Sequence, residues 1–572
     1  MKRFERRAFR ENEAFPFLGT GEPGGKASGL ASIQETIYRH FRGNPYCDIS
    51  VDIPRMTVLL TDIFSAFMEA GNLYETACSE LADERIAYHF QKAELPATVV
   101  GDLLHLISTV HTPLAIRSSS LLEDALYEPL AGVYETKMIP NNQFDAESRY
   151  RKLVEAIKFV YASTYFRQAK QYFAAGKKHL EEEMMGVIIQ EVVGERYGNR
   201  FYPTLSGVAR SHNFYPIGNA RPQDGVVNLA LGLGKTIMDG GRAWSYCPEC
   251  PAAPPPYSCA GDLLDLSQRD FWAVNMGPAP EYNPIRETEY LAQTSLQEAE
   301  EDGTLRYVCS TYDQASDRLQ MGLGTAGPRL VDFSPILQGE VVPLNNLVKE
   351  LLAISKQELG REVEIEFAMS YDPLLKRPPR FGFLQVRPMV VSTESVQVDL
   401  ETLPAGRIFI QSRSVMGNGR IEGIDRVIYA KPGSFQPGRT RQIAGEMEAM
   451  NQELAKQETP YLLIGFGRWG SSDPWLGIPV AWSQISGARV IVEATLPDMH
   501  PDFSQGSHFF HNISSLGVPY FSVDGSQRSQ IDWSWLEAQP VVRETEFVRQ
   551  VRCQSPLQVL VNGRDATGVI LK

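Results

Sequence analysis

REVEIEFAMSYDPLLKRPPRFGFLQVRPM, residues 361–389, is the stretch that decides the fold, and it predicts two strands joined by a Pro-rich connection. In the first strand Glu364 and Glu366 alternate with apolar residues, so both carboxylates lie on one face. In the second strand Gln385 and Arg387 share a face for the same reason. If the strands pair as a hairpin, the four side chains converge, and carboxylate oxygens suit Mg²⁺ while a guanidinium suits phosphate oxygens. The alternative is a solvated hairpin with one polar face, because half-exposed strands commonly alternate in this way.

Length, composition and charge narrow the class of protein. The 572 residues exceed what one hydrophobic core can organise, so roughly two to four domains are expected. A hydrophobic content of 43% and a charged content of 22% are ordinary for a soluble globular protein. The net charge of -14 disfavours binding to nucleic acid or to an anionic membrane surface. The basic start, MKRFERRAFR, precedes no apolar segment, and no run is long enough to span a bilayer, so we expect a cytoplasmic chain.

The cysteines leave one metal site open. Seven cysteines are few for this length and fit a reducing compartment. Cys247, Cys250 and Cys259 lie close together in SYCPECPAAPPPYSC and could form part of a zinc site. No fourth ligand of suitable type is near, and the segment is rich in proline, so a surface loop with incidental thiols is the favoured interpretation.

Two segments carry candidate phosphate-binding residues. FLGTGEPGGKASGLASIQETI, residues 17–37, is Gly-rich and leads into a helix at Lys26. Backbone N–H groups at a helix N-terminus and a lysine ammonium can cradle a phosphate, although many such helix starts bind nothing. A short apolar strand over residues 114–116 is followed by Arg117 and three serines. An arginine with hydroxyls at a strand end suits phosphoryl oxygens.

The segment VVNLALGLGKTIMDGGR, residues 226–242, invites a P-loop interpretation that its spacing excludes. A P-loop needs a glycine five residues before Gly234, and Leu229 occupies that position. A Gly-rich turn beside a nucleotide is still compatible with the sequence.

Hydrophobic periodicity outlines the remaining elements and the domain boundaries. It predicts one long helix over residues 149–183, a buried strand in MMGVIIQEVV that carries Gln190, and a helix that ends at Gly360. The polar stretch STESVQVDLETLPA is typical of a linker. We therefore expect two subdomains at residues 1–110 and 111–392, a linker at 393–405 and a separate α/β domain at 406–572.

The order of four motifs carries a family resemblance. GGKASGLA, RSSSLLED with its later AGVYET, GLGKTIMDGG, and EIEFA followed by FGFLQVRPM occur in succession over about residues 15–392. This region resembles the ATP-binding domain of the pyruvate phosphate dikinase and phosphoenolpyruvate synthase family, which also occurs in rifampin phosphotransferase. The resemblance implies a fold of the α/β (α+β) class: an ATP-grasp domain that holds the nucleotide between two subdomains, with a second, smaller α/β domain at the C-terminus.

The resemblance also implies roles for the polar side chains. Lys26 and Arg117 match the family's phosphate-binding lysine and arginine, and Arg387 matches the arginine that contacts the transferring phosphates. Glu366 matches a magnesium-ligating glutamate, and Gln385 matches its partner near the metal. The implied ligands are ATP and Mg²⁺.

Two further positions belong to the expected cofactor site, and a third departs from the family. Gln190 matches the strand that passes the adenine, and Glu364 joins the site as the second carboxylate of the hairpin. After Gly-Leu-Gly the family usually has Glu, whereas this sequence has Lys235. We expect that lysine to add positive charge near the site.

A histidine near the C-terminus is the candidate phosphoryl carrier. Family enzymes pass a phosphoryl group to a histidine on a mobile domain. In QGSHFFHNISSLGVPYFSV, His508 follows Gly506 and Ser507, and its distance to the Leu-Gly-Val-Pro run equals the family's. A histidine at a helix N-terminus can act as a nucleophile whose phosphate the helix stabilises. His511 is a rival, and a structural histidine is the alternative.

The resulting hypothesis is a dikinase-type phosphotransferase that passes a phosphoryl group from Mg-ATP to His508 and then to an unidentified acceptor. We expect no barrel for phosphoenolpyruvate or pyruvate, no nucleic acid and no membrane, with a homodimer as one assembly to test. The alternatives are an ATP-grasp ligase that works through an acyl phosphate and a non-catalytic nucleotide-binding regulator. The acceptor and the choice between AMP and ADP as product are left open by the sequence.

Overall fold

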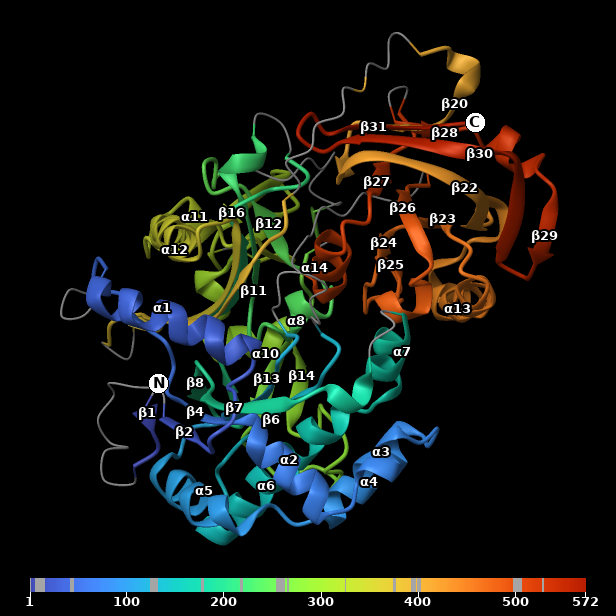
Figure 1. Ribbon diagram of the computed structural model, residues 1–572. Coiled ribbons are helices and arrows are strands. Elements are labelled where there is room, and N and C mark those ends of the chain that lie inside the picture. Colours follow the sequence, from blue (N-terminus) through green and yellow to red (C-terminus); the bar gives the residue numbers. More distant parts are fainter. Residues whose placement is uncertain are drawn as a thin grey trace. The chain divides into compact units, whose positions relative to one another are not determined.

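The computed structural model describes most of the chain (Figure 1). The described residues are 2–5, 16–41, 46–123, 132–175, 179–216, 220–253, 263–264, 267–324, 326–373, 377–391, 398, 403–496, 507–526 and 529–572. Most of the predicted linker, as well as Cys259 and Gly506, lies outside them.

The chain divides into two compact units. Unit 1 contains residues 1–210, 227–237 and 242–388, and unit 2 contains residues 389–572 with two segments from earlier in the chain, 211–226 and 238–241. The predicted domain boundaries remain predictions, because a division by contacts does not test where the chain folds independently.

The first sheet of unit 1 contains β5, the strand that carries Arg117. The strand predicted over residues 114–116 continues to Ser120, so Arg117 and the three serines lie within it and not after its end. Its order is β1-β2-β4-β7-β5-β6, with bounds β1 Lys2–Arg3, β2 Pro16–Leu18, β4 Met56–Leu59, β7 Met185–Glu191, β5 Leu114–Ser120 and β6 Thr136–Ile139. Helix α2 packs on this sheet against β7, and α6 packs against β5 and β6. Helices α4 and α5 pack in turn against α6; the bounds are α2 Thr61–Ala70, α4 Asp83–Lys92, α5 Ala97–Thr109 and α6 Ala146–Ser163.

The second sheet contains the predicted hairpin. Its order is β12-β11-β10-β18-β19-β3, with bounds β12 Trp244–Tyr246, β11 Val226–Ala230, β10 Leu205–Arg210, β18 Val363–Ser370, β19 Arg380–Pro388 and β3 Ser50–Asp52. Helices α1 (Gly25–Phe41) and α12 (Leu344–Leu359) pack on this sheet and on each other. Helix α12 ends at Gly360 in the left-handed conformation, as predicted from the sequence.

The hairpin pairs in the predicted register and then shifts. Glu364 lies opposite Arg387 and Glu366 opposite Gln385, while the register shifts directly after Glu366 and leaves Leu384 as an extra residue in β19. Such a β-bulge reverses which face the following residues occupy. Side chains on both sides of the bulge therefore reach the same hydrophobic core, namely Val363, Ile365, Phe367, Phe381, Phe383 and Val386.

Smaller sheets and helices complete unit 1. Their orders are β14-β13-β9-β8 and β16-β15-β17. The strands are β8 Glu195–Tyr197, β9 Arg200–Tyr202, β13 Asp270–Asn275, β14 Leu291–Ser295, β15 Cys309–Asp313, β16 Arg318–Met321 and β17 Arg329–Val331, and the helices are α3 Tyr74–Cys78, α7 Arg167–Ala175, α8 Lys235–Met238, α10 Leu296–Glu301 and α11 Ser334–Leu337. The predicted helix over 149–183 is wrong in its extent: a turn that buries Tyr165 separates α6 from α7.

Unit 2 is a second α/β unit with its own core. Its sheet has the order β21-β27-β26-β23-β22-β30-β31-β20-β28, with β29 paired to β30. Strands β22, β23, β26 and β27 are parallel neighbours. The bounds are β20 Ile408–Ser412, β21 Val415–Met416, β22 Asn418–Ala430, β23 Tyr461–Phe466, β24 Arg468–Trp469, β25 Gly477–Ile478, β26 Ala488–Ala494, β27 Tyr520–Val523, β28 Gln530–Ile531, β29 Val541–Glu544, β30 Val548–Asn562, β31 Thr567–Leu571, α13 Thr440–Lys456, α14 His508–Ser515 and α15 Trp533–Glu537.

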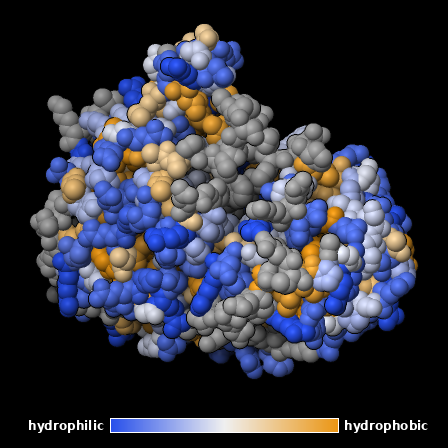
Figure 2. All heavy atoms as spheres, turned by 90° about the horizontal axis from the view of Figure 1, so that it is seen from above, coloured by the Kyte–Doolittle hydropathy of each residue, from blue (hydrophilic) through white to orange (hydrophobic). Residues whose placement is uncertain are grey.

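The surface carries scattered apolar residues. On the face shown in Figure 2, hydrophilic residues cover most of the area and hydrophobic residues occupy separate, smaller areas. Within the described residues, no helix combines the length and the apolar character that crossing a bilayer requires.

Candidate functional site

Arg117 connects the two six-stranded sheets of unit 1. It lies on β5, and its guanidinium donates to side chains on β7 and on the hairpin. The acceptors are Gln190 Oε1 at 3.2 Å, Glu366 Oε2 at 3.3 Å and Gln385 Oε1 at 2.6 Å. It also donates to the carbonyl oxygen of Leu384 at 3.0 Å. The structure thus brings together four of the residues that the sequence predicts for the site.

The bulge in β19 explains one of these contacts. Carbonyl groups in the middle of a regular ladder bond to the neighbouring strand, whereas a bulge leaves its extra residue out of the pairing. Leu384 is that residue, and its carbonyl oxygen accepts from Arg117. The same bulge allows Gln385 and Arg387 to face the site while Phe383 and Val386 reach the core.

The hairpin carries a ladder of buried charges. Glu364 is 1% exposed and forms ion pairs with Arg387 at 2.7 Å and with Arg210. Arg387 also contacts Glu366, which additionally pairs with Arg117 at 3.3 Å. The pKa of Arg210 is lowered, because burial lowers it more than the adjacent Glu364 carboxylate raises it. An arginine nevertheless stays protonated at neutral pH. Three guanidinium groups thus face two carboxylates, and the cluster carries one net positive charge.

Lys26 lies at the first turn of α1 and packs against the end of β5. Its Nζ is 2.5 Å from Glu123 Oε1 and donates to Ser118 Oγ at 3.2 Å. Ser119 Oγ accepts from the N–H of Ala27 at 3.1 Å, so the start of the helix is bonded to the same strand end. Lys26 and Arg117 are the two predicted phosphate-binding residues. Arg117 belongs to β5, and Lys26 contacts the next residue of that strand, Ser118.

The glycines before Lys26 allow this close approach. Gly24 has a φ of +78°, and a Cβ built on it or on Gly25 would overlap the carbonyl oxygens of Ser119 and Glu123. The Gly-rich segment therefore has a packing role at the end of β5, whether or not it also binds a phosphate.

This packing gives a testable expectation for stability. Gly25→Ala should lower the free energy of unfolding by about 1–3 kcal/mol, because backbone must move to admit the methyl group. The measurement is thermal and denaturant unfolding of the full chain. Gly445→Ala is the matched control: it lies inside α13 with no atom within 4 Å of the new Cβ, and should be neutral or stabilising by about 0.5–1 kcal/mol. Equal stability of the Gly25→Ala chain and the wild type would contradict the packing role.

Lys235 forms an ion pair with Glu287. It begins α8, and its Nζ contacts both carboxylate oxygens of Glu287 at 3.0 and 2.9 Å. The expected addition of positive charge to the site is corrected accordingly, because a carboxylate offsets it locally. Glu287 carries no motif in the sequence that would have paired it with Lys235.

The two candidate histidines belong to unit 2, whereas the charged cluster belongs to unit 1. His508 is the first residue of α14, and Ser507 caps the helix by accepting from the N–H of Phe510 at 3.3 Å. The predicted helix N-terminus at His508 is therefore present. His511 is 3% exposed and lies within the helix, which favours His508 over this rival as an accessible nucleophile.

The cysteine segment shows a turn in its described part. The N–H of Cys250 donates to the carbonyl oxygen of Cys247 at 3.0 Å, whereas Cys259 lies outside the described residues. Among the residues that the structure does describe, no group of three His, Cys, Asp or Glu side chains is placed to hold a metal ion.

Sequence reasoning missed two parts of the site. Arg210 ends the buried strand β10 and pairs with Glu364, and its signal was a charged residue at the end of an apolar run. Glu123 binds Lys26, and its place in RSSSLLED next to Arg117 was the available signal.

The donor set fits a polyphosphate. The hairpin cluster has net positive charge and planar guanidinium donors. The ammonium of Lys26, which is paired with Glu123, contacts Ser118, the residue that follows Arg117. The Nε2 of Gln190 is buried and has no hydrogen-bond partner among the described residues, so a donor is left at the site. Glu366 and Gln385 offer two oxygen ligands for Mg²⁺. Two protein ligands are enough for Mg²⁺ when phosphates supply the others.

Two α/β layers that share a cluster of arginines, a lysine and buried carboxylates define an ATP-binding domain of the ATP-grasp type. A family model described as pyruvate phosphate dikinase, AMP/ATP-binding domain, matches residues 21–404, which is more than half of the chain, and the chain belongs to this family. Comparison with curated proteins gives no match. The predicted family and fold class are thereby confirmed.

Proposed function

We propose that the protein is a dikinase-type phosphotransferase in which unit 1 binds Mg-ATP and passes a phosphoryl group to His508. The observation that carries the proposal is the convergence of Arg117 with Glu366 and Gln385, which joins the strand beside Lys26 to the hairpin. Lys26, Arg117 and Arg387 would bind phosphate oxygens. Glu366 and Gln385 would hold Mg²⁺, with Gln190 and Glu364 completing the cofactor site.

Phosphoryl transfer suits these residues because it depends on charge neutralisation and positioning more than on covalent protein chemistry. Bound Mg²⁺ neutralises phosphate charge and orients the phosphates. Arg387 is held by Glu364 on one side and by Glu366 on the other, so its guanidinium is fixed before a ligand arrives. Arg117 is held by amide, carbonyl and carboxylate oxygens, which phosphate oxygens can replace one by one.

His508 would accept the phosphoryl group. An imidazole nitrogen attacks the β-phosphorus of ATP, and the bond from that phosphorus to the oxygen it shares with the α-phosphate breaks, so AMP departs and His508 carries the β- and γ-phosphates. Water then cleaves off the terminal phosphate as inorganic phosphate, which leaves one phosphoryl group on the histidine. The N-terminus of α14 favours the negative charge placed on its first residue. The group then passes to an acceptor that is a small molecule or a partner protein.

Product analysis tests this proposal. With ATP labelled at its β-phosphate and Mg²⁺ present, we expect a labelled, acid-labile phosphoenzyme together with AMP and inorganic phosphate, because a dikinase cleaves between the α- and β-phosphates. His508→Ala should lower the amount of bound label at least about tenfold relative to wild type. His89 is an exposed histidine of α4, and His89→Ala should be labelled like wild type. Production of ADP without any phosphoenzyme would overturn the carrier role.

A regulatory nucleotide-binding protein is a second candidate because Glu366, the implied metal ligand, already contacts two guanidinium groups. This alternative predicts saturable ATP binding with neither AMP nor ADP formed. An ATP-grasp ligase would need no histidine, so full turnover by His508→Ala in the presence of an acid and an amine would favour it.

A further inference from the structure

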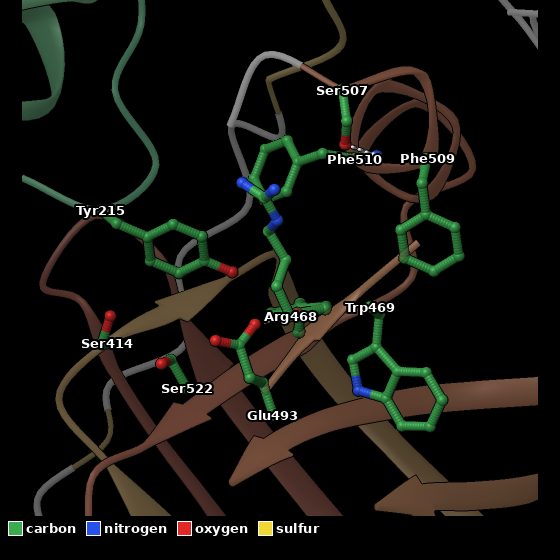
Figure 3. Close-up of a pocket in the computed structure, with 10 residues that line it drawn as sticks. Tyr215, Ser414, Arg468, Trp469, Glu493, Ser507, Phe509, Phe510 and Ser522 are labelled. Atoms are coloured by element: carbon green, nitrogen blue, oxygen red, sulfur yellow. Dashed lines mark hydrogen bonds between the residues drawn. The ribbon is translucent and has the colours of Figure 1, made fainter. Parts of the chain in front are cut away.

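Unit 2 contains a pocket whose place in the fold suits a ligand (Figure 3). Strands β26 and β27 are parallel neighbours connected through α14, and β23 lies beside β26. Arg468 follows the carboxyl end of β23, and Ser507 stands at the N-terminus of α14; both line the pocket. In open α/β sheets, ligands bind outside the carboxyl ends of parallel strands, where helix N-termini also point.

The floor of the pocket is polar and comes from neighbouring strands. Glu493 on β26 lies opposite Ser522 on β27, and Tyr520 on the same strand donates a hydrogen bond to the Glu493 carboxylate. Ser414 lies beside them, since its carbonyl oxygen accepts from the N–H of Ser522 at 2.8 Å. The hydroxyls of Ser414 and Ser522 form no hydrogen bond within the described part of the chain.

Tyr215 supplies a buried donor that points into the pocket (Figure 3). The residue is 7% exposed, and its hydroxyl has no hydrogen-bond partner among the described residues. The ring packs against Phe510 at 5.8 Å and Tyr520 at 6.2 Å between centroids, which fixes its direction. Burial raises its pKa well above the ordinary value, so the hydroxyl is a neutral donor. Buried donors are normally satisfied, so one directed into a pocket indicates an acceptor on a ligand.

Arg468 gives the pocket a fixed positive charge. It is 4% exposed, and its guanidinium donates to the carbonyl oxygens of Gly240 and Gly241, the latter at 3.3 Å. A guanidinium held in this way is oriented for an oxyanion. The Glu493 carboxylate at the floor accepts hydrogen bonds only, so a ligand group that contacts it must be a donor.

We propose that this pocket binds a small organic oxyanion that also carries a hydroxyl group. The carboxylate or phosphate would lie between Arg468 and the hydroxyl of Tyr215, and the ligand's hydroxyl would donate to Glu493. The proposal does not depend on ATP binding, because every residue that forms the pocket belongs to unit 2.

Calorimetric titration of the full chain without nucleotide tests the proposal. The probes are lactate, a hydroxy carboxylate; glycerol 3-phosphate, a hydroxylated phosphate ester; and propionate, which has the carboxylate but no hydroxyl. We expect saturable binding of lactate or glycerol 3-phosphate, and the tighter of the two identifies the oxyanion. Propionate should bind at least about tenfold more weakly than lactate if the carboxylate arm is correct. No saturable binding of either hydroxylated probe overturns the proposal.

Variants place the binding in this pocket. Tyr215→Phe keeps the ring and removes the unpaired hydroxyl, so it should fold and weaken the bound probe about tenfold. Tyr246→Phe is the matched control, since its hydroxyl is also buried without a partner in the described chain but lies in unit 1; it should bind like wild type. Ser522→Ala is a second variant with the same expected direction. Unchanged affinity in both pocket variants overturns the assignment.

The nucleotide site can be tested separately in the same experiment. Arg117→Lys alters unit 1 only, so it should retain the affinity of the wild type for the probe even where ATP turnover is lost. Loss of probe binding in that variant would contradict a site confined to unit 2.

Discussion

Glu364→Gln should lower the free energy of unfolding of unit 1 by about 3–5 kcal/mol. The carboxylate of Glu364 is 1% exposed and lies between two buried guanidinium groups, those of Arg387 and Arg210. Glutamine has nearly the same shape but no charge, so the variant removes the carboxylate that Arg210 and Arg387 share in a medium that solvates charge poorly, while Arg387 keeps its contact with Glu366. The cost is mainly the desolvation of arginines that remain buried, and not the strength of the original ion pairs.

The measurement is guanidinium chloride unfolding followed by tryptophan fluorescence and circular dichroism. Because the chain has two units, their transitions are fitted separately and only the affected one is compared. Glu35→Gln is the matched control in unit 1. Glu35 pairs with Arg39, and the two side chains are 67% and 77% exposed, so little change is expected. A Glu364→Gln chain as stable as this control would show that the buried ladder does not act as a unit.

Period-2 alternation predicts which charged side chains of the hairpin share a face. It does not predict how the two strands pack around Arg117. Glu364 and Glu366 do face Gln385 and Arg387, because alternation in two adjacent strands fixes which side chains share a face. The bulge at Leu384 follows from no residue type in the segment. The bulge leaves the Leu384 carbonyl oxygen out of the pairing, and that oxygen accepts from Arg117 on a strand distant in sequence, a contact that local alternation does not report.

The Gly-rich segment shows a different limit. The pattern before Lys26 predicted a flexible phosphate cradle, and the structure adds a second cause for the same residues. Gly24 and Gly25 lie against the backbone of Ser119 and Glu123, so their lack of a side chain is required by packing. The structure thus gives a packing reason for these glycines, while the phosphate cradle stays a prediction.

The sequence predicts that the C-terminal part is an α/β domain, but it does not predict which earlier segments of the chain belong to the same unit. Segments 211–226 and 238–241 belong to it although they lie far from its other residues in sequence, within the region matched by the family model. Periodicity reports local structure, and neither segment has a feature that names its partner. Only the folded chain shows that Tyr215 lines the pocket and that the carbonyl oxygen of Gly240 holds Arg468.

Arg117→Lys should reduce ATP turnover by about 100- to 1000-fold while the protein remains folded. The guanidinium reaches three side chains and one carbonyl oxygen at once, from 2.6 to 3.3 Å. A lysine ammonium keeps the positive charge but is compact. It therefore cannot reach the same set of oxygen atoms, and it cannot present two parallel N–H donors to a phosphate. The loss is expected in kcat, because the charge that moves during transfer is stabilised by donors already in position.

The comparison is with Arg380→Lys. Arg380 lies on the same strand as Arg387, but its side chain is 37% exposed and pairs with Asp52 at 3.1 Å, so turnover should stay near that of wild type. Measuring kcat and KM separately decides the role of Arg117. A raised KM with kcat unchanged would mean that the guanidinium binds ATP equally in the ground and transition states. Wild-type values for both would remove Arg117 from the site, and with it the link between Lys26 and the hairpin.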